Sequence, residues 1–172
     1  MAVPEMTELQ TRLETTVRRL AEALKERDWT LCTAESCTGG WMAKVCTDLP
    51  GSSNWFHGGY VAYSYPAKEQ QLGVIHADLE VHGAVSEEIA SQMAIGARRQ
   101  SGADITVAAT GIAGPTGGMP RKPVGLVCFG WSVRGGRIVT ASQVFEGDRE
   151  SVRLQTVQRG LEGVIEQLAV PD

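Results

Sequence analysis

Positions 33–40 read TAESCTGG and place a hydroxyl, a thiol and two glycines where a strand is expected to turn into a helix. A side chain at such a turn lies over free backbone N–H groups, near the positive end of the helix. These donors would hold an oxyanion, so Ser36 is a candidate nucleophile with Thr38 and Gly39 beside it. Serine at a helix start is also a common N-cap, and the pattern leaves both interpretations open.

Cys37 is a second candidate nucleophile, because the pKa of a thiol falls at a helix N-terminus. A small cysteine beside a strand is also a common packing residue, so both roles remain open. The spacing of the cysteines and histidines matches neither a CxxC pair nor a zinc motif. We therefore expect no metal ion and no disulfide among Cys32, Cys37, Cys46, Cys128, His57, His76 and His82.

Lys68 ends the segment YSYPAK at 63–68 and falls in the first turn of an expected helix. The helix dipole disfavours an ammonium group there, and a neutral lysine is a general base that can pair with a serine. Lowering a lysine pKa from about 10.4 to about 7 requires roughly 4–5 kcal/mol, of which a helix end supplies about 0.3–1 kcal/mol. Burial must supply the rest, and a solvated surface lysine is the alternative.

The glycine-rich segment ATGIAGPTGG, at 109–118, follows an expected buried strand, where α/β sheets place their ligand crevices. Thr110 and Gly111 open this loop, and its glycines would let backbone N–H groups approach a ligand closely. The loop contains neither a Walker motif nor a GxGxxG dinucleotide motif. A plain surface loop is an equal alternative.

The segment GDR at 147–149 begins the last expected helix, with Asp148 as its N-cap. Arg149 lies in the first turn of that helix, where a cation is disfavoured unless it meets an anion. A phosphate shared with the helix terminus would satisfy both groups, whereas a surface arginine is the simpler interpretation.

Helices and strands that alternate along the chain must position these segments. The late pair of strands is joined by Arg-Gly-Gly, a hairpin signal. Early alternation followed by a hairpin predicts an α/β fold, a three-layer α/β/α sandwich with a mixed sheet. Hydrophobic spacing and caps predict helices over 7–27, from 36 to before 50, from 66, over 87–100 and over 148–168, and strands over 30–34, 60–63, 105–109, 124–133 and 137–145.

Composition narrows the class of protein. The 172 residues are enough for about one domain, which we expect to span 1–172, and 42% hydrophobic with 21% charged residues excludes a disordered chain. The net charge of −4 argues against a nucleic-acid partner. No apolar run approaches the ~20 residues of a membrane span, and the polar N-terminus lacks signal-peptide character, so we expect no membrane partner and a cytoplasmic location.

Taken together, these segments resemble the nicotinamide mononucleotide deamidase family, also called the CinA C-terminal domain. The resemblance covers nearly the whole chain and follows the family's order and spacing. It rests on TAESCTGG at 33–40, GGYVAYSYPAK at 58–68, HGAVSEE at 82–88, ATGIAGPTGG at 109–118, KPVG at 122–125 and GDR at 147–149.

The resemblance implies hydrolysis of the carboxamide of nicotinamide mononucleotide to nicotinic acid mononucleotide and ammonia, within pyridine nucleotide recycling and without metal or cofactor. It also implies an α/β/α fold and a serine–lysine dyad, whose positions match Ser36 and Lys68. Neutral Lys68 would take the Ser36 proton, and an acyl-enzyme would follow. Tyr63, Thr110 and Arg149 would line the site by the same resemblance.

The chain departs from the family pattern at one place. Tyr65-Pro66 departs from the more polar residues expected after the YS motif, which affects the angle at which the following helix begins. The chain resembles the stand-alone form of a domain that other members join to an N-terminal nucleotide-hydrolase domain. A non-catalytic nucleotide-binding or interaction module, related to competence or DNA damage, is the alternative function. We also expect a homodimer or a higher homo-oligomer.

Overall fold

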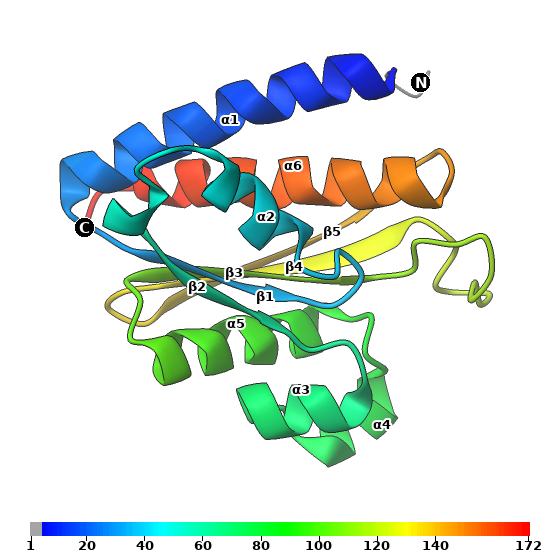
Figure 1. Ribbon diagram of the computed structural model, residues 1–172. Coiled ribbons are helices and arrows are strands. Elements are labelled where there is room, and N and C mark those ends of the chain that lie inside the picture. Colours follow the sequence, from blue (N-terminus) through cyan, green and yellow to red (C-terminus); the bar gives the residue numbers. More distant parts are fainter. Residues whose placement is uncertain (1–4) are drawn as a thin grey trace.

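The structure, a computed structural model, describes residues 5–172. Figure 1 shows the order of its elements. The first half of the chain contains α1 (Met6–Arg27), β1 (Leu31–Glu35), α2 (Trp41–Asp48), the 3-10 helix η1 (Ser52–Asn54), β2 (Phe56–Val61), α3 (Tyr65–Leu72) and α4 (His76–His82). The second half contains α5 (Glu87–Ser101), β3 (Ile105–Gly111), β4 (Leu126–Val133), β5 (Arg137–Val144) and α6 (Arg149–Leu168).

The strands form one mixed sheet in the order β2-β1-β3-β4-β5. β1 is parallel to both of its neighbours, whereas β3 with β4 and β4 with β5 form antiparallel pairs. Glu35 at the end of β1 pairs with Val61 of β2 and with Ala109 of β3. The three parallel strands therefore end side by side, and the segments that follow them meet at one edge of the sheet.

Helices cover both faces of the sheet: α1, α2 and α6 lie on one face, and α3, α4 and α5 lie on the other (Figure 1). β1 is buried throughout and serves both cores, because successive side chains of a strand point to opposite faces. Leu31 packs in the core on the α6 face, and Cys32 and Ala34 pack in the core on the α5 face. The expected three-layer α/β/α sandwich with a mixed sheet is thereby confirmed.

Two helix caps lie where the sequence places them. The Ser86 hydroxyl accepts the backbone N–H of Ile89 at 3.2 Å at the start of α5, and the Asp148 carboxylate accepts the N–H of Ser151 at 2.9 Å at the start of α6. Each cap satisfies one N–H that has no partner within its helix. The Asp148 cap therefore defines where α6 begins, at the GDR segment.

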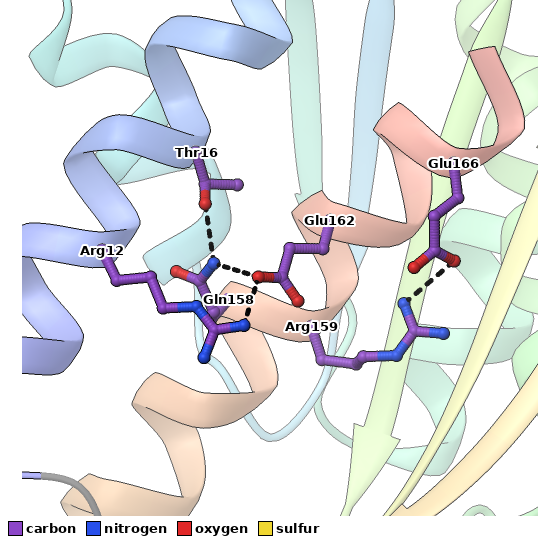
Figure 2. A network of polar contacts seen from close by, with 6 residues as sticks. All are labelled: Arg12, Thr16, Gln158, Arg159, Glu162 and Glu166. Atoms are coloured by element: carbon purple, nitrogen blue, oxygen red, sulfur yellow. Dashed lines mark hydrogen bonds and ion pairs between the residues drawn. The ribbon is translucent and has the colours of Figure 1, made fainter. Parts of the chain in front are cut away.

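Polar contacts tie the middle of α6 to α1, as Figure 2 shows. The Gln158 amide is buried and donates to Thr16 Oγ1 at 2.7 Å and to Glu162 Oε1 at 2.6 Å. Glu162 also pairs with Arg12 across the same interface at 2.8 Å. Apolar side chains of both helices belong to the same core cluster, so α6 packs against α1 along its length.

α2 begins later than expected. The helix starts at Trp41, not at residue 36, because a turn separates it from β1. Gly39 and Gly40 have φ angles of 61° and 103° in this turn, which is the left-handed region that glycine reaches without steric cost. Residues 36–40 of the TAESCTGG segment therefore form a separate turn between β1 and α2, whose backbone groups are outside any helix.

β2 and α4 also differ from expectation. β2 spans Phe56–Val61 instead of 60–63, because Gly58 and Gly59 interrupt the apolar pattern of this edge strand. α4 was not expected, and its N-cap Ile75 makes no side-chain hydrogen bond that a capping pattern would reveal. Across residues 5–172, no helix is both long enough and apolar enough to cross a membrane.

Candidate active site

Ser36 and Lys68 meet at the edge where the parallel strands end. Lys68 Nζ lies 2.9 Å from Ser36 Oγ, and it also donates to the carbonyl oxygens of Ala62 at 3.1 Å and Tyr63 at 2.8 Å. Only 1% of Lys68 and 7% of Ser36 is exposed. The surface interpretation of Lys68 is therefore wrong, and the burial that a neutral lysine requires is present.

The local sequence explains how the amine reaches the hydroxyl. Ser64 caps α3 by accepting the N–H of Ala67 at 3.1 Å, and Pro66 occupies the first turn, where its missing N–H costs little. Tyr65-Pro66 is thus compatible with a regular helix start. Gly96 of α5 lies against the backbone of Leu72, so α3 packs closely on α5 with Lys68 turned toward the sheet.

Burial lowers the pKa of Lys68 from its usual value to about 8. A neutral amine has two N–H donors and one lone pair, which match the two carbonyl oxygens and the Ser36 hydroxyl. The Ser36 hydroxyl then donates to Nζ, and after proton transfer the ammonium donates to all three oxygens. The same arrangement therefore accommodates the amine before and after it takes a proton from Ser36.

Glu35, and not Ser36, caps the start of α2. Its fully buried carboxylate accepts the backbone N–H of Met42 at 2.7 Å and of Ala43 at 3.0 Å, at the start of α2. The same carboxylate accepts the hydroxyl of Thr38 at 2.7 Å. The interpretation of Ser36 as an N-cap is wrong, because its hydroxyl contacts Lys68 instead of a helix N–H.

The turn after Ser36 leaves two backbone donors free. The N–H of Ser36 donates to the Ala109 carbonyl at 3.0 Å, and that of Gly39 donates to the Ser36 carbonyl at 3.1 Å. The N–H groups of Cys37 and Thr38 have no acceptor on any other residue of the described range 5–172. These two N–H groups are therefore available to a ligand, whereas the Thr38 side chain is already held by Glu35.

Cys37 is buried, with 6% of the residue exposed, and burial raises the pKa of its thiol to about 12. The thiolate is the nucleophilic form of cysteine, and it is scarce at neutral pH when the pKa is this high. The structure thus favours the packing role of Cys37 over the nucleophilic one. An added Cβ on Gly111 would lie 3.2 Å from the Cys37 sulfur, so the start of the glycine-rich loop also packs tightly here.

The other residues expected to line the site differ in their exposure and in their hydrogen-bond partners. Tyr63 is 63% exposed as a residue, while its carbonyl oxygen accepts a hydrogen bond from Lys68. Thr110 is buried, and its hydroxyl donates to the Ala84 carbonyl at 2.9 Å. This bond ties the end of β3 to the segment between α4 and α5. Arg149 is exposed and donates to the Gly114 carbonyl at 2.8 Å, so it tethers the glycine-rich loop to α6.

A surface hollow of about 610 Å³ adjoins the turn. It gathers three cationic side chains and one carboxylate around the amino-terminal ends of α2 and α6. Ser36 and Lys68 lie outside the lining, whereas Thr38 and Gly39 belong to it. The lining residues are Thr38, Gly39, Gly40, Trp41, Lys44, Arg149, Glu150 and Arg153.

Arg153 is a further residue at this turn that the sequence did not single out. Its guanidinium group donates from Nε to the Cys37 carbonyl at 3.0 Å and from Nη2 to the Thr38 carbonyl at 3.1 Å. It also lies over the Trp41 ring, 5.3 Å from the centroid. The available signal was its position four residues after Arg149, which places both side chains on one face of a helix.

Comparisons with known proteins found one matching family and several similar proteins. The family described as the CinA C-terminal domain matches residues 13–168. The curated protein named nicotinamide-nucleotide amidohydrolase PncC from Enterobacter agglomerans is 49% identical, over 86% of this chain and 90% of that protein. The protein of the same name from Escherichia coli K12 is 48% identical, over 87% of this chain and 90% of that protein. The crystal structure of a CinA superfamily protein from Klebsiella pneumoniae shares 39% identity and a TM-score of 0.88, over 91% of this chain and 98% of that one.

Proposed function

Because this chain belongs to the CinA C-terminal domain family, we propose that it hydrolyses the carboxamide of nicotinamide mononucleotide to nicotinic acid mononucleotide and ammonia. The single observation that carries the proposal is the 2.9 Å contact between Lys68 Nζ and Ser36 Oγ in a buried site. The substrate class is supported by the curated relatives named nicotinamide-nucleotide amidohydrolase. The match to this chain covers 90% of the length of each of these relatives.

In the acylation step, neutral Lys68 accepts the proton of Ser36 as Oγ attacks the carboxamide carbon. The carbonyl oxygen of the substrate becomes an oxyanion, for which the N–H groups of Cys37 and Thr38 are the available donors. The carbon–nitrogen bond then breaks while the Lys68 ammonium gives its proton to the departing amino group. Ammonia leaves, and an ester between Ser36 and the nicotinoyl group remains.

In the deacylation step, a water molecule takes the place that ammonia left. Lys68 is neutral again after giving up its proton, so it accepts a proton from this water as the oxygen attacks the ester carbon. The same backbone donors hold the second oxyanion. The ester bond to Ser36 Oγ breaks, Oγ recovers a proton from Lys68, and the carboxylic acid product is released.

The hollow beside the turn suits the phosphate of the mononucleotide. Its lining carries Lys44, Arg149 and Arg153 against the carboxylate of Glu150, so it has a net positive charge. Arg149 is exposed, and its position in the first turn of α6 favours an anion beside it. We assign the phosphate to this hollow, with the nicotinamide ring directed toward Ser36.

An assay of ammonia release with nicotinamide mononucleotide and related pyridine nucleotides tests the proposal. Ser36→Ala and Lys68→Ala should each reduce kcat by at least about 10³-fold, because each removes a partner of the proton transfer. Lys25→Ala is the matched control, since Lys25 is exposed on α1. Circular dichroism should show an unchanged fold in all three variants.

Two results would reject the proposal. Near-normal activity of Ser36→Ala would eliminate the dyad. Tight binding of the mononucleotide by the unmodified protein in calorimetry, without any ammonia, would favour the alternative of a non-catalytic nucleotide-binding module. Loss of activity only in the two dyad variants would support hydrolysis by Ser36 and Lys68.

We also propose that the protein is a homodimer or a higher homo-oligomer that works in the cytoplasm. Exposed apolar side chains near the end of β2, among them Val61, Tyr63 and Tyr65, offer a surface beside the site for a second copy. The four cysteines are free, in keeping with a reducing compartment. Sedimentation that shows only monomer at micromolar concentration would reject the oligomer.

A further inference from the structure

Arg153 links α6 to the turn that follows the nucleophile. The residue lies one turn after Arg149, and its guanidinium group binds two successive carbonyl groups of the turn, those of Cys37 and Thr38. The ring of Trp41 supports the guanidinium from one side. More than a hundred residues separate the two segments in sequence, so this contact is a specific feature of the folded chain.

The geometry of the peptide bonds shows what this contact does. The Cys37–Thr38 bond is trans, so its C=O and its N–H point in opposite directions. Because Arg153 holds the carbonyl from the α6 side, the N–H of Thr38 points away from α6. The next bond differs: the Thr38 carbonyl also meets Arg153, but the Gly39 N–H is used by the Ser36 carbonyl at 3.1 Å. Of these two N–H groups, only that of Thr38 is left for a ligand.

We propose that Arg153 is a positioning residue for the reaction, which orients and polarises the Cys37–Thr38 peptide so that its N–H stabilises the oxyanion. The inference rests on the proposed amide hydrolysis. Lys68 reaches Ser36 from the α3 layer on the other face of the sheet, so the turn is held between a cation of α6 and an amine of α3 (Figure 1). The charge on the guanidinium increases the positive character of the peptide N–H, because linked hydrogen bonds reinforce one another.

Arg153 also lines the hollow to which we assign the phosphate, so a purely substrate-binding role is the competing explanation. The direction of its donors favours positioning. Nε and Nη2 of Arg153 both donate to backbone carbonyls of the turn, whereas Arg149, which lines the same hollow, is exposed and donates from Nη1 alone to the Gly114 carbonyl. The two roles predict different kinetics: loss of phosphate binding raises KM, whereas loss of oxyanion stabilisation lowers kcat.

Steady-state kinetics of ammonia release from nicotinamide mononucleotide test the inference with Arg153→Met and Arg153→Lys. The matched control is Arg159→Met, because Arg159 lies on the same helix over the Trp131 ring, 5.1 Å from the centroid, and has no contact with the turn. We expect kcat of Arg153→Met to fall by about 10²-fold, the size of effect seen when one oxyanion donor is lost. KM should change less than about threefold, and the pH midpoint of kcat/KM should be unchanged.

Arg153→Lys should recover part of the lost kcat, because an ammonium group retains the charge but holds one carbonyl in place of two. This variant also decides the question if Arg153→Met fails to fold. A kcat within about twofold of the unmodified protein in both variants, or a rise in KM with kcat retained, would overturn the inference. If the unmodified protein itself releases no ammonia, the proposed function fails instead, so the two failures are distinguishable.

Discussion

The side chains of Glu35 and Ser36, which are adjacent in sequence, bind partners in opposite helical layers. Glu35 accepts the first N–H groups of α2 on one face of the sheet, and Ser36 contacts Lys68 of α3 on the other. Neighbouring side chains at the end of a strand point to opposite faces, so one residue step separates the structural role from the chemical one. Glu35 thereby fixes the backbone from which the nucleophile projects.

This relationship predicts that Glu35→Gln loses stability and activity together. A glutamine has one acceptor oxygen, so one N–H of Met42 or Ala43 would face an amide NH₂ group. An unsatisfied buried donor together with the lost charge should lower the free energy of unfolding by about 2 kcal/mol, as measured in urea. Glu22→Gln, on the exposed face of α1, is the control. Equal stability of the two variants would contradict the role given to Glu35.

The pH dependence of the reaction follows from the lowered pKa of Lys68. The amine acts as a base only when it is neutral, and the pKa of about 8 means that this form increases as the pH rises through 8. The value of kcat/KM should therefore rise tenfold per pH unit below the midpoint and level off above it. Rates measured from pH 6 to 9.5 would show this curve. A rate that falls as the pH rises through 8 would mean that the ammonium is the required form.

The sequence was sufficient for the layers of this fold and for the two residues that meet in the site. Ser86 and Asp148 predict the starts of two helices, and the glycines between β4 and β5 predict a hairpin. These features can be predicted because each depends only on neighbouring residues in the sequence. The pairing of Ser36 with Lys68 came from the family resemblance, because the local sequence alone left an N-cap serine and a surface lysine as open alternatives.

Other features depend on packing that no local pattern records. α4 has no capping side chain, and the glycines of β2 conceal an edge strand. The capping by Glu35 was hidden because serine is the more usual cap at such a position. Arg153 could not be predicted because its partners are two backbone carbonyl groups more than a hundred residues away. Every residue has such a group, so the sequence does not mark which ones Arg153 contacts.

Burial should protect the four thiols of this chain from alkylation. Burial raises the pKa of Cys37 to about 12 and of Cys32 and Cys128 to about 11, and it also raises the pKa of Cys46. Iodoacetamide at pH 7.5 should therefore leave ammonia release unchanged and add no mass to the folded protein. The same reagent in urea should label four cysteines by mass spectrometry, which serves as the control. Rapid inactivation of the folded protein would restore Cys37 as a nucleophile.

Gly96 sets the distance between α5 and α3. A Cβ at this position would overlap the carbonyl oxygen of Leu72, and a backbone group cannot move aside without moving α3. Gly96→Ala should therefore cost about 1–3 kcal/mol of unfolding free energy, in the range of overpacked cores. Because Lys68 lies on the displaced helix, kcat should also fall. Gly58→Ala is the matched control, since nothing lies within 4 Å of its added Cβ. If Gly96→Ala kept full kcat despite lower stability, the position of Lys68 would not depend on this close approach.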